Sequence, residues 1–271
     1  MSDSFLPRPD RARSADDVDG LIRHLYGPDA NLAATGVLHL TSVWRGPEGD
    51  APQGMTLRIG EHTPRSLWDL VSLGLARARA DAIMTSGRIL RMEPTLHHGF
   101  VGPGDLPRAL LDWRRRQGRD QPPISLVMTR SGELDFTHPL FHGSGRVIVY
   151  TSERGAWRLD SRAADAGVEV EIDPEPSVRA ALRFIRGAFG CATVSIEAGP
   201  SIARGLYEEP ITVDELLLST YLGSQLPTAA RGGRQIPHRR IERHFRRPAP
   251  AVVTRADDGQ DDDWRFERFV R

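Results

Sequence analysis

A short turn between an apolar run and a helical segment holds the residues best suited to bind an anion. The run 194–196 is β-forming, and the residues after Glu197 are small or helix-starting, namely Ala198, Gly199, Pro200 and Ser201. Small residues let a backbone approach a phosphate, and the free N–H groups of a helix start supply donors and a positive dipole end. The turn therefore indicates a nucleotide-phosphate site, with an ordinary tight strand-to-helix turn as the alternative.

Three charged residues at the ends of predicted elements add possible chemistry. Arg77 lies near the end of a predicted helix and Arg130 directly follows a predicted strand. A guanidinium can hold a phosphate through two parallel hydrogen bonds, although a solvated surface side chain is the alternative for both arginines. Glu197 ends a buried strand, and a carboxylate there either serves the site or caps the following helix.

Histidine and cysteine give weaker signals. His97 and His98 are metal-ligand types, but adjacent side chains point apart and no carboxylate pattern accompanies them, so we expect a loop and no metal. Cys191 is the only cysteine, and its place at the start of a buried strand favours packing over nucleophilic chemistry. We find no serine, histidine and aspartate arrangement with a recognisable nucleophile turn.

One concentrated basic run, residues 238–247, could contact nucleic acid or other phosphate groups. The acidic run Asp257–Asp263 follows closely and can neutralise it. A solvated surface segment is therefore the alternative, and we consider a nucleic-acid partner the weaker hypothesis.

Composition excludes several classes of protein. The 271 residues include 36 basic and 36 acidic ones, so bulk charge predicts neither nucleic acid nor membrane as a partner. No apolar run reaches the roughly 18 residues of a membrane span. The N-terminus lacks the layout of a signal peptide, and a single cysteine allows no internal disulfide. These features lead us to expect a cytoplasmic protein.

Every basic residue is arginine, because the chain contains no lysine. An arginine-rich coding bias explains this, and a demand for two-pronged phosphate contacts is the alternative. In either case Schiff-base and P-loop lysine chemistry is excluded.

Apolar periodicity predicts strands that alternate with helices. The expected strands are 36–44, 81–86, 124–129, 147–151, 168–172, 191–197, 213–222 and 264–270. The expected helices begin at the Ser14 capping box, at the Thr63-Pro64 pair and at Asp105, and two more span 177–189 and 202–207. Residues 45–61 are rich in glycine and proline, which predicts a loop of active-site size.

Apolar strands without alternation are typical of strands buried on both faces, so we expect an α/β fold with a mainly parallel sheet. The expected organisation is an N-terminal tail and helix over 1–30 and an α/β domain over 31–224. An irregular polar segment over 225–263 and a closing strand over 264–271 complete it.

Four motifs, in order and spacing, resemble the reductase domain of bacterial riboflavin biosynthesis, the C-terminal domain of RibD. They are Arg77-Ala78-Arg79-Ala80-Asp81-Ala82-Ile83, Glu93-Pro94-Thr95-Leu96, the strand ending in Thr129-Arg130-Ser131, and Ile196-Glu197-Ala198-Gly199-Pro200 followed by Val213-Asp214-Glu215-Leu216. The resemblance covers roughly 36–224 plus the last strand, and it marks the chain as a divergent member.

This resemblance implies a dihydrofolate-reductase-like three-layer sandwich and NADPH as cofactor. The implied substrate is 5-amino-6-(5-phosphoribosylamino)uracil or its 2,5-diamino analogue. Hydride would reach the ribosyl C1′ and open the sugar to a ribityl chain, while the protein supplies positioning and electrostatics. The resemblance also implies a homodimer.

Site residues carry over by position. The implied cofactor contacts are Thr85, Ser86, Gly87, Thr129, Arg130, Ser131, Thr151, Ser152, Ala198, Gly199, Pro200 and Ser201. The implied substrate contacts are Ser42, Trp44, Arg77, Glu93, Leu96 and Glu197. No catalytic residue is implied. Arg130 is placed to form a fork with a 2′-phosphate, which would favour NADPH over NADH.

Departures from the family pattern fall where chemistry would occur. Trp44 replaces an acidic residue, and Ile89 stands where a cofactor turn ends in threonine. Ala198 replaces a glycine, and His97 and His98 follow Leu96 where an arginine is usual. Three hypotheses remain open: a reductase of this type or one that has changed substrate, a non-catalytic binding or assembly module that keeps the fold, and a nucleic-acid binder that uses residues 238–247.

Overall fold

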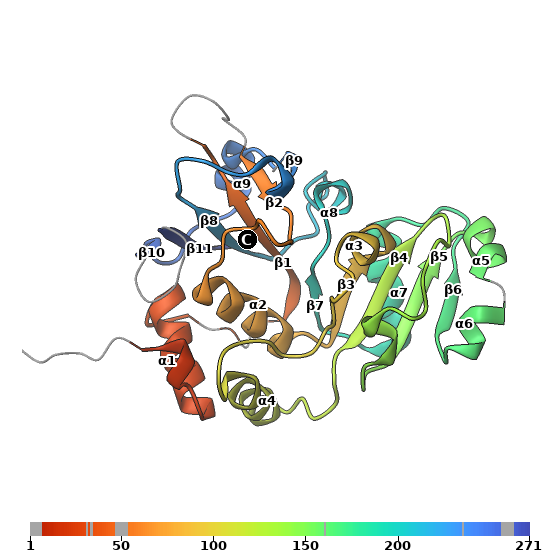
Figure 1. Cartoon of the computed structure of the whole chain (residues 1–271), viewed down its shortest axis with the longest axis horizontal. Helices are drawn as coiled ribbons and strands as arrows, with labels where there is room; N and C mark the ends of the chain where they lie inside the picture. The colour runs from red at the N-terminus through yellow and green to blue at the C-terminus, as the bar shows by residue number, and fades with distance from the viewer. Residues whose placement is uncertain are drawn as a thin grey trace, which may run out of the picture.

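One large sheet organises the chain. The computed structural model describes residues 7–30, 32, 35–46, 54–159, 161–234, 236–255 and 263–271. Within these residues the sheet has 11 strands, and its main path runs β10-β11-β8-β1-β7-β3-β4-β5-β6 (Figure 1). A ribbon of two further strands, β2 and β9, attaches to β1. The strands are β1 (Gly36–Trp44), β2 (Met55–Leu57), β3 (Ala82–Ser86), β4 (Ile124–Thr129), β5 (Val147–Thr151), β6 (Glu169–Ile172), β7 (Thr193–Ile196), β8 (Glu215–Tyr221), β9 (Arg231–Arg234), β10 (Val252–Thr254) and β11 (Trp264–Val270).

The central strands are parallel. β1, β3, β4, β5, β6, β7 and β8 pair in parallel, whereas β11 runs antiparallel between β8 and β10. Parallel neighbours need crossover connections, and the helices supply them. The predicted α/β fold with a mostly parallel central sheet is therefore confirmed.

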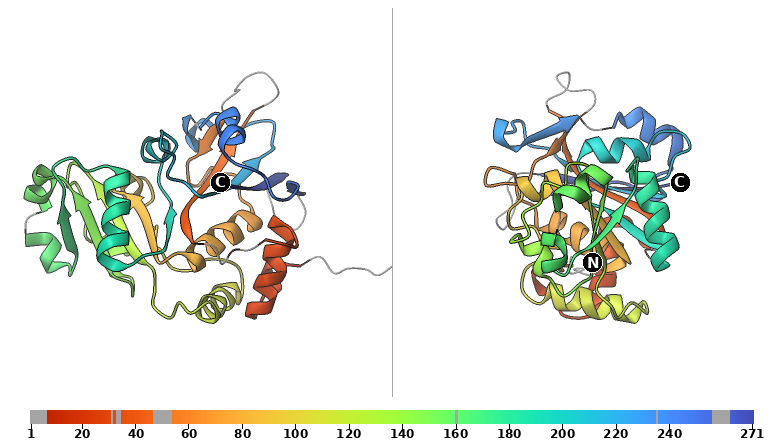
Figure 2. Two further views of the ribbon diagram at one scale, coloured as in Figure 1. Left: turned by 180° about the vertical axis from the view of Figure 1, so that it is seen from behind. Right: turned by 90° about the vertical axis from the view of Figure 1, so that its right-hand side faces the viewer.

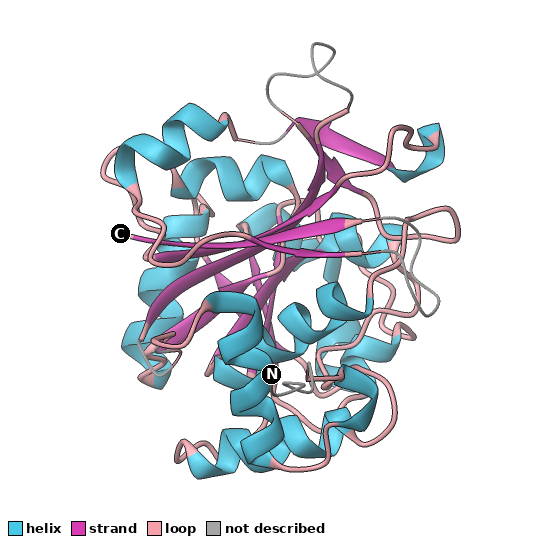
Figure 3. Ribbon diagram, turned by 90° about the vertical axis from the view of Figure 1, so that its left-hand side faces the viewer, coloured by secondary structure: helices cyan, strands magenta, loops and turns pink. Residues whose placement is uncertain are grey.

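Helices cover both faces of the sheet, as Figure 3 shows. They are α1 (Ala15–Tyr26), α2 (Leu67–Arg79), α3 (Gly87–Met92), α4 (Leu106–Arg116), α5 (Glu153–Leu159), α6 (Ser161–Asp165), α7 (Val178–Phe189), α8 (Pro200–Leu206) and α9 (His238–His244). In Figure 2, α1 and α5 lie toward opposite ends of the molecule. No helix in the described ranges is long and apolar enough to cross a membrane.

The two faces of the sheet form separate cores. Along β1, Val37 and Val43 pack with α7, α8 and α9, while Leu38 and Trp44 pack with α1, α2 and α4. A third cluster packs α3, α5 and α6 against β4 and β5. Because successive strand residues point to opposite faces, an apolar run fills both cores at once.

Local capping explains most helix starts. Ser14 and Asp17 form the predicted capping box of α1. The hydroxyls of Ser86 and Ser177 accept hydrogen bonds from the third residue of α3 and of α7. The prediction that α2 begins at Thr63-Pro64 is wrong. Its cap is Ser66, because the Thr63 hydroxyl donates to the carbonyl of Arg58 instead.

Acidic residues hold the amino-terminal ends of the parallel strands together, on the side opposite the carboxyl ends of the strands. Asp81 accepts from the backbone N–H groups of Ala192 and Thr193, and Asp214 accepts from Val37 N–H. Glu215 is buried and accepts from Arg79 and Arg268. Burial raises the pKa of Glu215, but Arg79 and Arg268 lower it further, so the net shift is downward. These residues of the Arg77–Ile83 and Val213–Leu216 motifs therefore hold the fold together.

The polar segment 225–263 is more ordered than the sequence predicts. Its described part contains β9, α9 and β10, which corrects the expected irregular structure. Helix α9 packs through buried Ile241, so the basic run 238–247 is mostly a packed helix. The predicted loop 45–61 also contains β2, which pairs with β1 and β9. Most of the acidic run Asp257–Asp263 lies outside the described residues.

Candidate functional site

The carboxyl ends of the parallel strands bring the predicted cofactor residues to one edge of the sheet. Thr129 pairs with Thr151 in the register of β4 and β5, and Ser86 lies beside Met128 in that of β3 and β4. On the other side of β3, Met84 pairs with Ile196 of β7. Turns after four strands therefore open on the same side, where α/β sheets bind ligands.

The turns after β4 and β5 pack directly against each other. Thr129 Oγ1 accepts from Gly132 N–H at 3.2 Å, and Ser152 Oγ donates to the Arg130 carbonyl at 3.0 Å. Gly132 has a φ of +67°, and a Cβ there would lie 2.2 Å from the Gly155 carbonyl oxygen. Only glycine permits this approach, which fixes the two turns as one unit.

Arg130 is the cation that this double turn presents. Its side chain is exposed, and its one hydrogen bond among the described contacts is long, 3.5 Å to the Pro176 carbonyl. Ser131 beside it accepts from Glu133 N–H. Thr151 is fully buried, and its Oγ1 has no partner within the described part of the chain. The exposed guanidinium therefore keeps most of its donors available for an anion.

The third predicted cofactor segment, after β3, begins a helix. Ser86 caps α3 by accepting from Ile89 N–H at 3.3 Å. Thr85 is buried, and its Oγ1 has no partner among the described residues. Gly87 packs closely against two side chains, because a Cβ there would lie 2.8 Å from the Leu134 side chain and 3.3 Å from the Thr129 side chain. This close approach connects α3 to the turn after β4.

The turn after β7 leaves room at the start of α8. Gly199 is the cap residue with no side-chain hydrogen bond, and a Cβ there would meet nothing within 4 Å. Ala198 and Pro200 are half-buried and Ser201 is exposed. The open space and the uncapped helix start suit a phosphate group.

Strand β9 lies against this turn, and the sequence did not predict it. A Cβ on Gly233 would lie 3.0 Å from Pro200, and one on Gly232 would lie 2.4 Å from the Thr56 hydroxyl. These two glycines let β9 fit between β2 and α8. Exposed Arg234 follows Gly233, the residue close to Pro200, and the Arg-Gly-Gly-Arg run has no strand propensity that would have predicted this position.

A buried ion pair anchors the substrate side of the predicted site. Arg77 and Glu197 meet side-on, with Nη2 to Oε2 at 2.7 Å and Nε to Oε1 at 3.0 Å. Their side chains are 2% and 10% exposed. Arg77 Nη1 also donates to the Gly99 carbonyl at 2.9 Å. The pair therefore joins α2, the turn after β7 and the segment that follows α3.

Glu93 is a second carboxyl in this cluster. It ends α3, and His138 contacts its backbone carbonyl at 3.0 Å. Burial and the nearby Glu197 raise the pKa of Glu93 to about 7, against the opposing effect of Arg77. Glu93 is therefore partly protonated near neutral pH, and it lies near the Glu197 carboxyl that Arg77 binds.

The residues after Glu93 serve packing more than charge. Leu96 packs partly against the core of β4 and β5. His98 is buried, and its Nδ1 lies 2.8 Å from the Ser125 hydroxyl. Burial and then Arg77 hold the pKa of His98 well below its usual value, so the ring is neutral. No group of three or more potential metal ligands occurs within the described ranges.

Ser42 and Trp44 lie at the end of β1 and are occupied by protein contacts. Ser42 Oγ donates to Asp69 of α2 at 2.9 Å. Trp44 is 8% exposed, its Nε1 donates to the Gly223 carbonyl, and Arg231 lies over its ring. The structure brings Arg77, Glu93 and Glu197 together, but it places the indole of Trp44 in the core between sheet and helices.

Comparison with known proteins identifies the fold. No family model and no curated protein match the chain. Among solved structures, a pyrimidine reductase-like protein of Corynebacterium diphtheriae matches with a TM-score of 0.59 and 21% identity, over 92% of this chain and 98% of that one. RibD of Acinetobacter baumannii matches with a TM-score of 0.57 and 15% identity over 87% of this chain.

The chain spans only 58% of that RibD protein. A riboflavin biosynthesis reductase of Saccharomyces cerevisiae matches with a TM-score of 0.50 and 13% identity, over 92% of this chain and 97% of that one. These likenesses confirm the predicted dihydrofolate-reductase-like fold and the structural resemblance to RibD.

Removing one partner of the Arg77–Glu197 ion pair should destabilise the protein strongly, whereas replacing both partners by apolar residues should destabilise it little. Arg77→Met leaves the Glu197 carboxylate buried without its partner, so we expect the free energy of unfolding to fall by about 3 kcal/mol. The double variant Arg77→Met/Glu197→Leu should recover most of that loss. Urea unfolding of both variants tests this. A loss below about 1 kcal/mol in the single variant would mean that the pair does not hold the site together.

Proposed function

We propose that the protein is an NADPH-dependent reductase that acts on a phosphoribosylamino-pyrimidine of the kind used in riboflavin biosynthesis. The observation that supports this most is the arrangement of one sheet edge. Glycine-dependent turns with an exposed arginine lie on one part of it, and a buried arginine–carboxylate cluster lies on the other. That is the division a hydride-transfer site needs between cofactor and substrate.

The residues present fit a dinucleotide phosphate. The double turn of Thr129, Arg130, Ser131 and Ser152 would hold the adenosine phosphate, with Arg130 forming a fork on the 2′-phosphate. The uncapped start of α8 after Gly199 would receive the pyrophosphate, with Arg234 of β9 adding positive charge. When bound, NADPH would supply the hydride.

On the substrate side, Arg77 orients Glu197. Hydrogen bonds from Arg77 Nε and Nη2 fix the carboxylate plane, so Glu197 can accept from substrate hydroxyl or amine groups in one defined geometry. The Arg77 side chain is buried, and its N–H groups donate to Glu197 and to the Gly99 carbonyl. Its proposed role is therefore to position Glu197, and the substrate phosphate would need another cation.

Glu93 can hold the proton that the reaction consumes. Reduction at the ribosyl C1′ with ring opening adds hydride to carbon and requires a proton on the ring oxygen. With a pKa of about 7, the Glu93 carboxyl is partly protonated at neutral pH and lies in the same cluster as Glu197. We assign Glu93 as the proton donor of this site.

One observation favours a substrate-switched member of the fold as the second candidate. The buried pairing of Arg77 removes the residue that the family resemblance assigns to the substrate phosphate. A substrate without that phosphate, or a nucleotide-binding module without catalysis, would be compatible with the same edge. We also place the protein in the cytoplasm, since its single buried Cys191 needs no oxidising compartment, and expect a homodimer.

Titration with NADPH and NADH tests the cofactor assignment. We expect selective binding of NADPH, with Arg130→Ala weakening it about 10- to 100-fold because a charged hydrogen-bonding partner of the 2′-phosphate is lost. Arg186→Ala, which removes an exposed arginine on α7 remote from the strand ends, is the matched control and should bind normally. Failure of both nucleotides to bind at millimolar concentration would contradict the proposal.

The proton on Glu93 can be tested by stability against pH. A carboxyl whose pKa is raised in the folded state contributes stability that is complete below its ordinary pKa near 4.5 and is lost as pH rises through about 7. Glu93→Gln mimics the protonated form, so it should match the parent protein at pH 5 and exceed it at pH 8 by about 1–2 kcal/mol. Equal stability of the two proteins across that range of pH would show that Glu93 ionises normally.

A further inference from the structure

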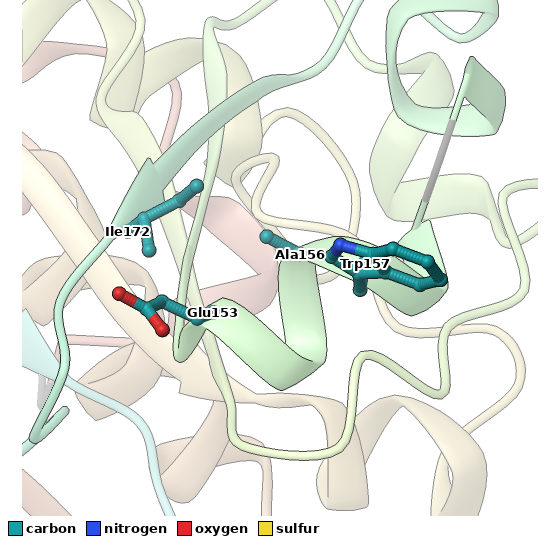
Figure 4. A pocket seen from close by; sticks show the side chains of 4 residues that line it. All are labelled: Glu153, Ala156, Trp157 and Ile172. Carbon is teal, nitrogen blue, oxygen red and sulfur yellow. The ribbon is translucent and has the colours of Figure 1, made fainter.

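An unusually exposed aromatic side chain lies beyond the proposed site. Trp157 of α5 is 88% exposed, whereas the other four tryptophans are at most 8% exposed. Ile172, the last residue of β6, is 50% exposed. Together with Glu153 and Ala156 they line a depression of about 550 Å³, and Figure 4 shows the four side chains around it. Exposed apolar side chains grouped around a hollow mark a recognition surface more often than chance exposure.

The depression adjoins the end of the sheet. Strand β6 pairs with β5 on one side, and no strand among the described residues pairs with its other side. An edge strand of this kind presents backbone N–H and C=O groups that can accept another strand. Val170 and Ile172 point to the face covered by α5, so a strand added to β6 would pass beside Trp157 and the depression.

The residues of β6 itself and those just after it carry only negative charges. Apolar and acidic residues alternate along 168–172, and Asp173 and Glu175 follow. Glu169 is paired with Arg146, and Asp173 accepts from the Tyr150 hydroxyl, but Glu171 has no side-chain partner among the residues that the structure describes. The edge therefore combines an apolar row on one face with carboxylates on the other.

We propose that the outer edge of β6, together with Trp157 and Ile172, binds an extended segment of a partner protein in which apolar and basic side chains alternate. Backbone hydrogen bonds to β6 would supply the pairing. The apolar side chains would enter the depression beside Trp157, and a basic side chain on the other face would meet Glu171.

A second copy of this chain is the less suitable occupant. Pairing β6 with another β6 would bring Glu169 and Glu171 opposite like charges, which destabilises cross-strand pairs. Acidic side chains on an edge strand commonly prevent self-association. The carboxylates of β6 therefore disfavour pairing with a second copy of the chain, while the Trp157 indole and the depression stay accessible to a basic partner.

Tryptophan fluorescence gives a direct test, because Trp157 is the one tryptophan of the five that solvent readily reaches. The probes are two short synthetic peptides, in one of which arginine alternates with valine and isoleucine, and in the other glutamate replaces every arginine. We expect the arginine peptide to bind with a dissociation constant below about 100 µM and to shield Trp157 from acrylamide quenching, and the glutamate peptide to do neither.

Variants connect binding to the edge. Glu171→Arg should weaken the arginine peptide at least about tenfold and create binding of the glutamate peptide. Calorimetry should show that Trp157→Ala weakens binding of the arginine peptide by a similar factor. Ile59→Ala, which changes an exposed apolar residue elsewhere, should leave that binding unchanged. Equal binding of both peptides, or an unchanged affinity in Glu171→Arg and Trp157→Ala, would overturn the proposal. If sedimentation showed that the protein is a dimer and that Trp157→Ala dissociates it, the occupant of this surface would be a second copy, and the proposal would be overturned.

Discussion

The buried ion pair of Arg77 and Glu197 is the constraint around which this edge of the molecule is arranged. Desolvating two charges is expensive, and the structure offsets the cost with a side-on geometry and a further hydrogen bond to the Gly99 carbonyl. Because the partners come from α2 and from the end of β7, the pair fixes how the helix layer meets the sheet. Both partners also act on Glu93, whose pKa is raised to about 7 by burial and then by Glu197, against the opposing effect of Arg77.

Buried or partly buried carboxylates also lie at the amino-terminal ends of the strands, where they hold the fold together. Asp81 and Asp214 bind backbone N–H groups at strand starts, and Glu215 joins Arg79 of α2 to Arg268 of β11. These groups are fully engaged with the protein. The turns at the carboxyl ends, in contrast, retain an exposed Arg130 and an uncapped α8, so the capacity to bind an anion is concentrated on one side.

The fold was predictable where its determinants are local. Mostly apolar runs defined β1, β4 and β5 with the bounds that the structure shows, because strands covered on both faces are rich in apolar residues. Strand β9 was missed because Arg-Gly-Gly-Arg has no strand propensity, and its pairing with β2 depends on a contact between Gly232 and Thr56 that no local pattern records. The start of α2 was misplaced because both Thr63 and Ser66 are good caps and the Thr63 hydroxyl has another partner.

The sequence predicted which strand ends form the candidate site, but it did not predict which side chains contact one another there. Strand order brings Thr129 and Thr151 together, whereas the meeting of Arg77 with Glu197, 120 positions apart, and the environment of Glu93 arise only from the packed fold. If the turns after β4, β5 and β7 bind NADPH, amide hydrogen exchange measured with and without NADPH should show protection at 130–132, 152–155 and 198–202. Protection elsewhere, or none at saturating NADPH, would contradict binding at these turns.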